Sequence, residues 1–253
     1  MEVKKYAARD AWGLLEVVQI GSEITLQFGN HTAQSGWDPA KPSELAFGYY
    51  QALCVGLVLH AAPQRLNLYG LGGGVLARYL LEYTELSLHV LDLRPQLAEI
   101  ARQYFGLNTE HPRLNLHFAD ISQADALAVI PPCDVIWIDL FDEQGMVPIP
   151  NRSLAALAEQ LDETGVLCIN IWRNALNEVT DITRALAHFF DAIPITIHVP
   201  DRYNSVLCYR KTAWTTNDLM RIHGRLDNFS PALQATLREA LSWVSPLPHK
   251  RSR

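Results

Sequence analysis

The chain has 253 residues, of which 49% are hydrophobic and 19% charged, with 14 Gly and 14 Pro. This composition excludes disordered, collagen-like and disulfide-scaffold proteins, and it indicates one large folded domain with or without a small appendage. The formal net charge of −6 disfavours non-specific binding to nucleic acid or to an anionic membrane, and it suits a cationic ligand.

The cysteines and the N-terminal segment indicate a cytoplasmic protein. The four cysteines lie far apart and form no C-x-x-C pair, which favours buried free thiols over disulfides or zinc ligands. The histidines have no ligand-like spacing, so no metal site is predicted. The sequence starts without the basic region and apolar stretch of a signal peptide, and the most apolar run, residues 52–59, is less than half of a membrane span.

Turn residues divide the N-terminal segment into short strands. Two runs with β-branched residues, 14–20 and 23–28, are separated by Gly21-Ser22 and predict a β-hairpin. We expect this hairpin to form a small subdomain over residues 1–41, ahead of a catalytic domain over residues 42–253. A helix is expected from Ser43 toward Leu59.

From residue 65 onward, strands and helices alternate. Strands are predicted at residues 66–70, 87–92, 113–120, 134–139 and 165–172, with helices at 75–83, 95–105, 122–129, 153–161 and 178–190. Such alternation predicts right-handed βαβ units and a parallel sheet covered on both faces. Two further strands, 193–199 and 205–210, are joined by a turn too short for a helix, so they should pair antiparallel at one edge. The predicted fold class is α/β, with a seven-stranded, mostly parallel sheet and C-terminal helices.

A glycine-rich turn follows the first parallel strand and opens a helix. Gly70, Gly72, Gly73 and Gly74 let the backbone turn sharply and approach a ligand closely. Asp92 follows Gly70 by 22 residues at the end of the next strand, where a carboxylate can accept both hydroxyls of a ribose. The absence of a following Gly-Lys-Ser/Thr argues against a P-loop. The pattern predicts an adenosine-type ligand, with dinucleotide binding and a purely structural turn as alternatives.

Three acids follow later strands. Asp120 and Asp139 end the next two strands, and Asp142 comes three residues after Asp139. Ligands in open parallel sheets bind beyond the carboxyl ends of the strands, so we expect these acids to border one crevice with Asp92. Asp120 could accept the adenine amino group, or cap the helix that follows. Asp139 and Asp142 could bind an amine cation and take its proton, or simply cap a surface loop.

Several motifs, taken in their order, carry a family resemblance. They are Gly70-Leu-Gly-Gly-Gly-Val-Leu-Ala-Arg, Val90-Leu-Asp-Leu-Arg-Pro, Phe118-Ala-Asp and Val135-Ile-Trp-Ile-Asp-Leu-Phe-Asp. Over residues 12–210 the chain resembles the spermidine synthase family of polyamine aminopropyltransferases. The resemblance implies a Rossmann-like, methyltransferase-type fold and, often, a homodimer. It also implies transfer of an aminopropyl group from decarboxylated S-adenosylmethionine, as co-substrate, to a diamine such as putrescine, with release of 5′-methylthioadenosine.

The resemblance also implies roles for single residues. Asp92 matches the family's ribose-binding acid and Asp120 the acid at the adenine amino group. Leu93, Ile121 and the glycine turn are expected in the same co-substrate site.

On the acceptor side, Asp139 matches the catalytic carboxylate that orients and deprotonates the attacking amine. Asp142 matches the second acid of that loop, and Gln34 matches a hairpin glutamine that lines the active site. Tyr203, in the turn between the last two strands, is expected to border the acceptor pocket, with a plain hairpin turn as the alternative.

Four positions depart from the family's pattern. Val75 stands where an acid follows the glycines, Tyr49-Tyr50-Gln51 where Tyr-His-Glu is usual, Arg94 where a second acid is common, and Glu143 where a proline is common. Two alternatives therefore stay open. One is methyl transfer from intact S-adenosylmethionine to a small molecule, and the other is a nucleoside-binding protein that has lost catalysis.

Overall fold

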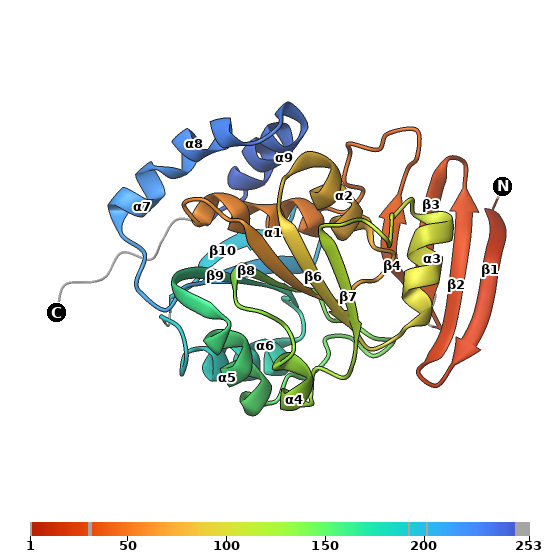
Figure 1. The fold of residues 1–253 in the computed structure, drawn as a ribbon, viewed down its shortest axis with the longest axis horizontal. Helices are drawn as coiled ribbons and strands as arrows, with labels where there is room; N and C mark the ends of the chain where they lie inside the picture. The colour runs from red at the N-terminus through yellow and green to blue at the C-terminus, as the bar shows by residue number, and fades with distance from the viewer. Residues whose placement is uncertain (1, 30–31, 192, 201, 246–253) are drawn as a thin grey trace.

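The structure is a computed structural model that describes residues 2–29, 32–191, 193–200 and 202–245. It contains a four-stranded sheet and a seven-stranded sheet that lie side by side, with the N-terminal sheet at one end of the molecule (Figure 1). The predicted α/β class and the mostly parallel seven-stranded sheet with an antiparallel final pair are confirmed.

The N-terminal sheet is antiparallel and larger than the predicted hairpin. Its strands follow one another in chain order: β1 (Glu2–Asp10), β2 (Gly13–Ile20), β3 (Glu23–Phe28) and β4 (Ala33–Trp37). The predicted hairpin is β2–β3, joined at Gly21-Ser22. The outer strands pair with both sides of this hairpin, and the apolar Leu15, Val17 and Leu26 are fully buried in the same core as side chains of α1 (Gly48–Leu59) and α2 (Val75–Tyr83).

The large sheet has the strand order β10-β11-β9-β8-β5-β6-β7. Its strands are β5 (Arg65–Tyr69), β6 (Ser87–Asp92), β7 (Leu114–Phe118), β8 (Cys133–Ile138), β9 (Leu161–Trp172), β10 (Ile195–His198) and β11 (Asn204–Tyr209). Strands β5 to β9 run parallel, whereas β11 is antiparallel to both β9 and β10. The start of β11 therefore lies at the same rim as the carboxyl ends of the parallel strands.

Helices cover both faces of the large sheet (Figure 1). One layer holds α1 (Gly48–Leu59), α2 (Val75–Tyr83), α7 (Thr216–Met220), α8 (Ile222–Arg225), a 3-10 turn (Leu226–Asn228) and α9 (Pro231–Leu241). The opposite layer holds α4 (Ala124–Leu127), α5 (Asn151–Glu159) and α6 (Leu176–Leu186). Helix α3 (Gln96–Tyr104) lies beside the N-terminal sheet.

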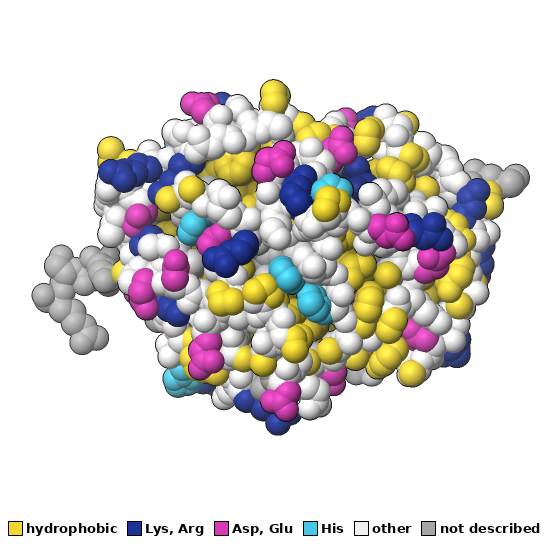
Figure 2. All heavy atoms as spheres, in the orientation of Figure 1, with side chains coloured by type: hydrophobic (Ala, Val, Ile, Leu, Met, Phe, Trp, Pro, Cys, Tyr) yellow, Lys and Arg dark blue, Asp and Glu magenta, His cyan; other side chains and the backbone are white. Residues whose placement is uncertain are grey.

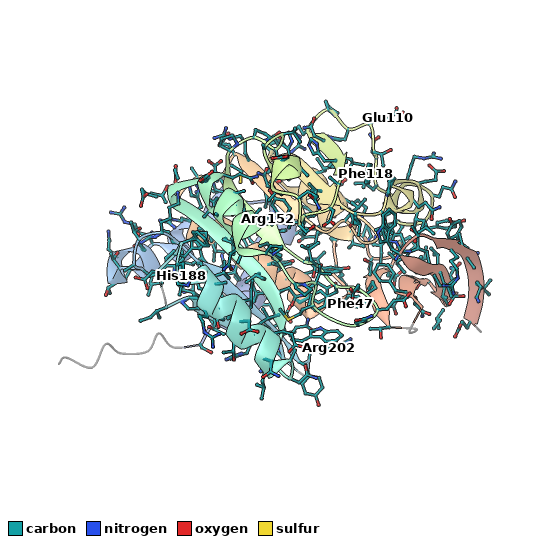
Figure 3. All side chains as sticks on the ribbon, turned by 90° about the horizontal axis from the view of Figure 1, so that it is seen from below. Phe47, Glu110, Phe118, Arg152, His188 and Arg202 are labelled. Atoms are coloured by element: carbon teal, nitrogen blue, oxygen red, sulfur yellow. The ribbon has the colours of Figure 1, made fainter. Side chains whose placement is uncertain are left out.

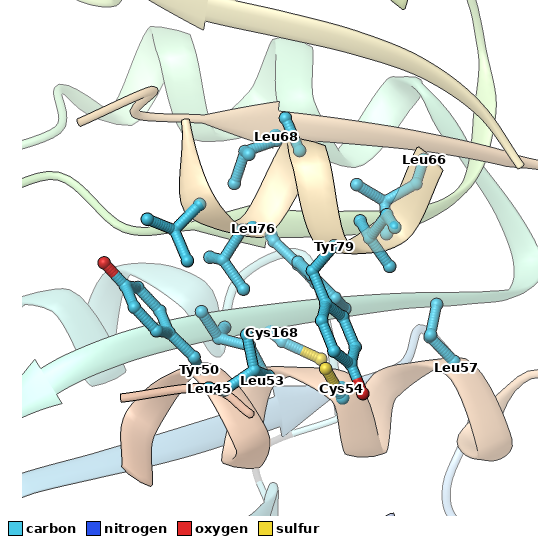
Figure 4. Packing of buried hydrophobic residues seen from close by; sticks show 14 of the residues in the cluster. Leu45, Tyr50, Leu53, Cys54, Leu57, Leu66, Leu68, Leu76, Tyr79 and Cys168 are labelled. Carbon is cyan, nitrogen blue, oxygen red and sulfur yellow. The ribbon is translucent and has the colours of Figure 1, made fainter. Parts of the chain in front are cut away.

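The strands are buried on both faces because alternate side chains enter two separate cores. Val135 and Trp137 of β8 belong to the core under α1 and α2, whereas Ile136 and Ile138 belong to the core under α5 and α6. In the first core, side chains of α1, α2 and β5 interlock around Tyr79 (Figure 4). All four cysteines are buried and free, as predicted.

Helix α1 begins later than predicted, at Gly48 rather than near Ser43. Residues 38–47 form turns instead, with backbone N–H groups of Lys41 and Glu44 bonded to the carbonyls three residues earlier. Phe47 is extended at the helix start, so that Tyr49 and Tyr50 come to the rim of the large sheet. In the described part of the chain, every helix is too short or too polar to cross a bilayer.

Candidate active site

A cavity of about 600 Å³ lies between the N-terminal sheet and the carboxyl ends of the parallel strands. A volume of this size suits a drug-sized ligand. Most of the residues predicted for the site line this cavity: Gln34, Gly70, Gly72, Asp92, Leu93, Asp120, Ile121, Asp139 and Asp142.

Three predicted residues are absent from the cavity's described lining. Gly73 and Gly74 lie in the glycine turn but behind its cavity surface. Tyr203 is 69% exposed to solvent, while its neighbours Arg202 and Asn204 line the cavity. The residues on either side of Tyr203, and not Tyr203 itself, therefore face the cavity.

The glycine turn is shaped by contacts that leave no room for a side chain. Gly70 has φ +104°, and a Cβ there would lie 2.1 Å from the backbone oxygen of Asp139. Because a backbone atom cannot move aside as a flexible side chain can, the end of β5 and the end of β8 approach this closely only with glycine. The backbone N–H of Gly73 donates to Ser35 Oγ at 2.8 Å, which ties the turn to β4.

Asp92 is held rigidly at the end of β6. Its Oδ2 accepts from the backbone N–H of Leu71 at 2.7 Å, and its Oδ1 accepts from that of Arg94 at 2.9 Å. The side chain is buried, and this desolvation raises its pKa despite the N–H donors and the nearby guanidinium. Each oxygen keeps further lone pairs, so the carboxylate can accept additional hydrogen bonds from hydroxyls.

Arg94, one of the departures from the family's pattern, belongs to the contact between the two sheets. Its guanidinium donates to both carboxylate oxygens of Asp10 at 2.8 and 2.9 Å and to the carbonyl of Gly13 at 3.2 Å. Its Cζ lies 4.9 Å from the ring centre of Phe28. Both charged side chains are less than a tenth exposed, so this ion pair attaches the N-terminal sheet to the loop that follows Asp92.

Asp139 lies directly after β8 and faces the cavity. Its Oδ1 accepts from the side-chain amide of Asn170 at 2.9 Å. Enclosure by the surrounding protein raises the pKa of Asp139 to about 6, with the Asn170 hydrogen bond as the opposing effect. The pKa values of Tyr49 and Tyr50 are raised as well, first by burial and then by the Asp139 charge.

The loop after Asp139 spans the two sheets. Asp142 Oδ1 accepts from the backbone N–H groups of Gln144 at 2.7 Å and Gly145 at 3.0 Å, so this carboxylate caps its own loop while lining the cavity. Glu143 Oε1 accepts from the backbone N–H of Gly29 at 3.1 Å, which connects the loop to the N-terminal sheet. Glu143, which stands where the family commonly has a proline, thus closes one side of the cavity.

Asp120 follows β7 and also combines a structural contact with the cavity. Its Oδ1 accepts from the backbone N–H of Ser122 at 2.8 Å, which stabilises the turn before α4. The helix-capping alternative is wrong, because Gln123 is the N-cap residue of α4 and no side chain of the described residues caps this helix; Asp120 stabilises the preceding turn and borders the cavity near Ile121.

Sequence reasoning missed several residues of the cavity wall. Asn170 of β9 and Asn204 of β11 carry no local signal, because Asn170 reaches Asp139 only through the parallel pairing of β9 with β8, and Asn204 reaches Asn170 only through the antiparallel pairing of β11 with β9. Phe47 and Arg202, far apart in sequence, lie together at one side of the molecule (Figure 3), with the guanidinium carbon 5.7 Å from the ring centre. Tyr49, one of the departures from the family's pattern, also lines the cavity, and its hydroxyl donates to the carbonyl of Gln34 at 3.2 Å.

Acidic groups dominate the charges of the cavity's described lining. It holds two guanidinium groups, Arg94 and Arg202, and six carboxylates: Glu23, Asp92, Asp120, Asp139, Asp142 and Glu143. Among the described residues, no cluster of three or more His, Cys, Asp or Glu side chains is arranged to hold a metal ion. On the face of the molecule in Figure 2, Lys and Arg side chains are interspersed with Asp and Glu.

Comparison with known proteins assigns the family. No protein-family model matches the chain. The polyamine aminopropyltransferase of Chromobacterium violaceum is 31% identical to it over 189 residues, which cover 72% of this chain and 70% of that protein. This chain belongs to the polyamine aminopropyltransferase family. A polyamine aminopropyltransferase of Neisseria meningitidis serogroup A is 28% identical over 187 residues, with the same coverage of both chains.

The fold agrees with this assignment. A crystal structure of spermidine synthase in complex with the transition state analogue AdoDATO superposes with a TM-score of 0.77, covering 96% of this chain and 85% of that chain at 15% identity. The likeness shows a shared fold. The resemblance predicted from the order of the motifs is therefore confirmed by relatives in sequence and by a neighbour in structure.

Proposed function

We propose that this chain transfers an aminopropyl group from decarboxylated S-adenosylmethionine to a small amine of the polyamine class. The observation that carries the proposal is the position of Asp139, a carboxylate with a raised pKa, in one cavity with the glycine turn and Asp92. Membership of the polyamine aminopropyltransferase family supports this reaction over methyl transfer and over an inactive binding protein.

Asp92 and the glycine turn are the proposed site of the adenosine end of the donor. The carboxylate is fixed by two backbone N–H groups, which leaves it oriented to accept the ribose hydroxyls. Asp120 and Ile121 lie farther along the same rim and would border the adenine.

Asp139 is the proposed base. The amine nitrogen of the acceptor attacks the carbon next to the sulfonium, a C–N bond forms and the C–S bond breaks. The sulfur leaves as neutral 5′-methylthioadenosine, so no acid is needed to protonate it. The amine loses one proton to Asp139, and catalysis depends on alignment and on this proton acceptor.

The charge of the cavity supports cationic substrates. Arg94 is paired with Asp10, so much of the acidic lining is left to attract a sulfonium and an amine. Val75, which replaces the usual acid after the glycines, is buried at the cavity wall. The donor's amine would therefore be held by the acids beside Asp139 and not by the start of α2.

The rate should depend on the protonation of Asp139. A base accepts a proton only when ionised, so we expect kcat/KM to fall tenfold per pH unit below about pH 6, where the pKa of this group lies. Steady-state rates between pH 4.5 and 8.5 at subsaturating acceptor measure this decrease in kcat/KM. A value of kcat/KM that stays constant down to pH 5 contradicts the assignment of the base.

The direct test compares the two donors. Calorimetric titration should give tighter binding of decarboxylated than of intact S-adenosylmethionine, because the intact molecule adds a carboxylate to an acidic cavity. Mass spectrometry after addition of putrescine, cadaverine and spermidine should then detect an acceptor heavier by one aminopropyl group. Preference for the intact donor, or label from its methyl group in an acceptor, refutes the proposal in favour of methyl transfer.

Asp92→Asn should weaken nucleoside binding. The amide loses the charge and turns a donor toward the backbone N–H groups of Leu71 or Arg94, so we expect the Kd for 5′-methylthioadenosine to rise by about 10- to 100-fold. Asp134→Asn is the matched control. Asp134 also accepts from two backbone N–H groups, those of Gln64 and Arg65, but lies outside the cavity. Equal losses in both variants would refute the assignment of Asp92.

The proposal also covers the acceptor molecule, the oligomeric state and the cellular location of the protein. The chain is proposed to act as a cytoplasmic homodimer on a free small amine, without nucleic acid or membrane partners. The net charge of −6 supports the exclusion of nucleic acid, and the family resemblance supports the dimer. Light scattering of the purified protein tests the dimer.

A further inference from the structure

Two side-chain amides connect the last strand of the large sheet to Asp139. Asn204 Nδ2 donates to Asn170 Oδ1 at 3.0 Å, and Asn170 Nδ2 donates to Asp139 Oδ1 at 2.9 Å. Asn170 is buried, with 3% of its surface exposed, and Asn204 is half-buried at the cavity wall. We infer that Asn170 and Asn204 form an amide relay that positions Asp139 and keeps it ionised for the proposed transfer reaction.

The relay follows from the direction of the strands. Ile138 of β8 pairs with Ile169 of β9, which places Asn170 beside the residue that follows β8. In the antiparallel pair of β9 and β11, Asn170 lies opposite Val206, so Asn204 is its diagonal neighbour on the same face. A parallel last strand would bring its end, and not its start, to this rim.

The charge of Asp139 fixes the direction of the hydrogen bonds. An ionised carboxylate only accepts, so the Asn170 amide must turn its NH₂ group toward Asp139 and its oxygen away. That oxygen then accepts from Asn204. When Asp139 is protonated on Oδ2, its Oδ1 still accepts from Asn170, but this neutral hydrogen bond is weaker than the charge-assisted bond to the ionised carboxylate. The relay therefore favours the ionised form.

Asn170 is also the contact that opposes the rise in the pKa of Asp139. The other titratable and charged groups of the described cavity wall are Tyr49 and Tyr50 on α1, Asp142 and Glu143 on the following loop, Arg202 before β11, and Asp92, Arg94, Asp120 and Glu23. The tyrosines stay neutral at the pH of the reaction because burial raises their pKa values. Loss of the relay would therefore leave Asp139 easier to protonate.

The test follows the protonation of Asp139 in variants of the relay. Asn170→Ala should raise the midpoint of the acid limb of kcat/KM by about one pH unit, because one charge-assisted hydrogen bond is lost. Asn204→Ala should raise it by about half as much, since Asn170 stays in place. Far above the midpoint, both variants should regain most of the wild-type rate. Asn115→Ala, on the exposed face of the edge strand β7, is the control and should keep the wild-type profile.

A second measurement does not depend on turnover. The carboxyl ¹³C signal of Asp139, assigned as the one missing from Asp139→Asn, should titrate near pH 6 in the wild type and at higher pH in both relay variants. The inference is overturned if Asn204→Ala loses activity equally at every pH, or if the NMR midpoint stays at the wild-type value. Because Asn204 is half-buried, its variant remains informative even where Asn170→Ala fails to fold. A wild type that titrates near pH 6 but transfers no aminopropyl group refutes the proposed function and leaves the relay intact.

Discussion

Replacing Asp139 by asparagine should lower kcat for aminopropyl transfer by about 10²- to 10⁴-fold, the usual contribution of a general base. Asparagine keeps an oxygen for the Asn170 amide but accepts no proton from the acceptor amine. Binding of 5′-methylthioadenosine should stay within a few-fold of the wild type, because the glycine turn and Asp92 are unchanged. Single-turnover rates and calorimetry on the same preparation measure the two effects.

Urea denaturation at pH 8 checks that Asp139→Asn folds as well as the wild type. The pKa of Asp139 is raised from 3.8 in the unfolded chain to about 6, so its contribution to stability is greatest at low pH and is lost as the pH rises through 6. At pH 8, Asp139→Asn should therefore unfold at a urea concentration no lower than the wild type. Asp181→Asn, on the exposed side of α6, is the control for rate. Undiminished turnover by Asp139→Asn would mean that another group accepts the proton.

Gly70→Ala should be the most damaging single change in the glycine turn. The backbone at Gly70 has φ +104°, and the new Cβ would lie 2.1 Å from the backbone oxygen of Asp139. The ends of β5 and β8 must then separate, so we expect the free energy of unfolding to fall by at least about 3 kcal/mol. The separation also moves the proposed base away from the proposed donor site, so activity should be lost in any folded fraction.

Gly21→Ala is the control that tests the cost of a positive φ without a steric clash. Gly21 also has a positive φ, +63°, but a Cβ there meets no atom within 4 Å. This variant should lose only about 1 kcal/mol, the cost of a left-handed backbone for alanine. Urea denaturation of both variants gives the comparison. Equal losses would show that the approach of Asp139 to the turn is unimportant.

Most of the fold can be predicted from the sequence because the patterns that specify it lie within short stretches of contiguous residues. The alternation of apolar strands and helices, the glycine turn and the acids at strand ends all lie within short windows, and the structure brings most of these predicted side chains to one cavity. The strands β1 and β4 were missed, since β1 is rich in charged residues and β4 contains a glycine. Their pairing depends on β2 and β3 more than on their own composition.

The site was harder to predict wherever a contact crosses the sheet. An asparagine in a strand has no distinguishing pattern in sequence, and Asn170 and Asn204 reach Asp139 only through the pairing of β9 with β8 and of β11 with β9. Arg94, a departure from the family's pattern, is also explained only by a residue distant in sequence. Its charge, two residues after the proposed ribose-binding Asp92, is paired with Asp10, a residue from the other sheet.

The reversed direction of β11 has a consequence for how such enzymes diversify. The proposed donor half of the cavity is built from β5, β6 and β7, whose rim segments lead into helices, whereas β11 reaches the rim from a short turn at the edge of the sheet. Residues in that turn can be exchanged or lengthened without shifting the register of the central strands. If the proposed function is correct, changes in that turn would alter the choice of acceptor and leave the nucleoside site unchanged.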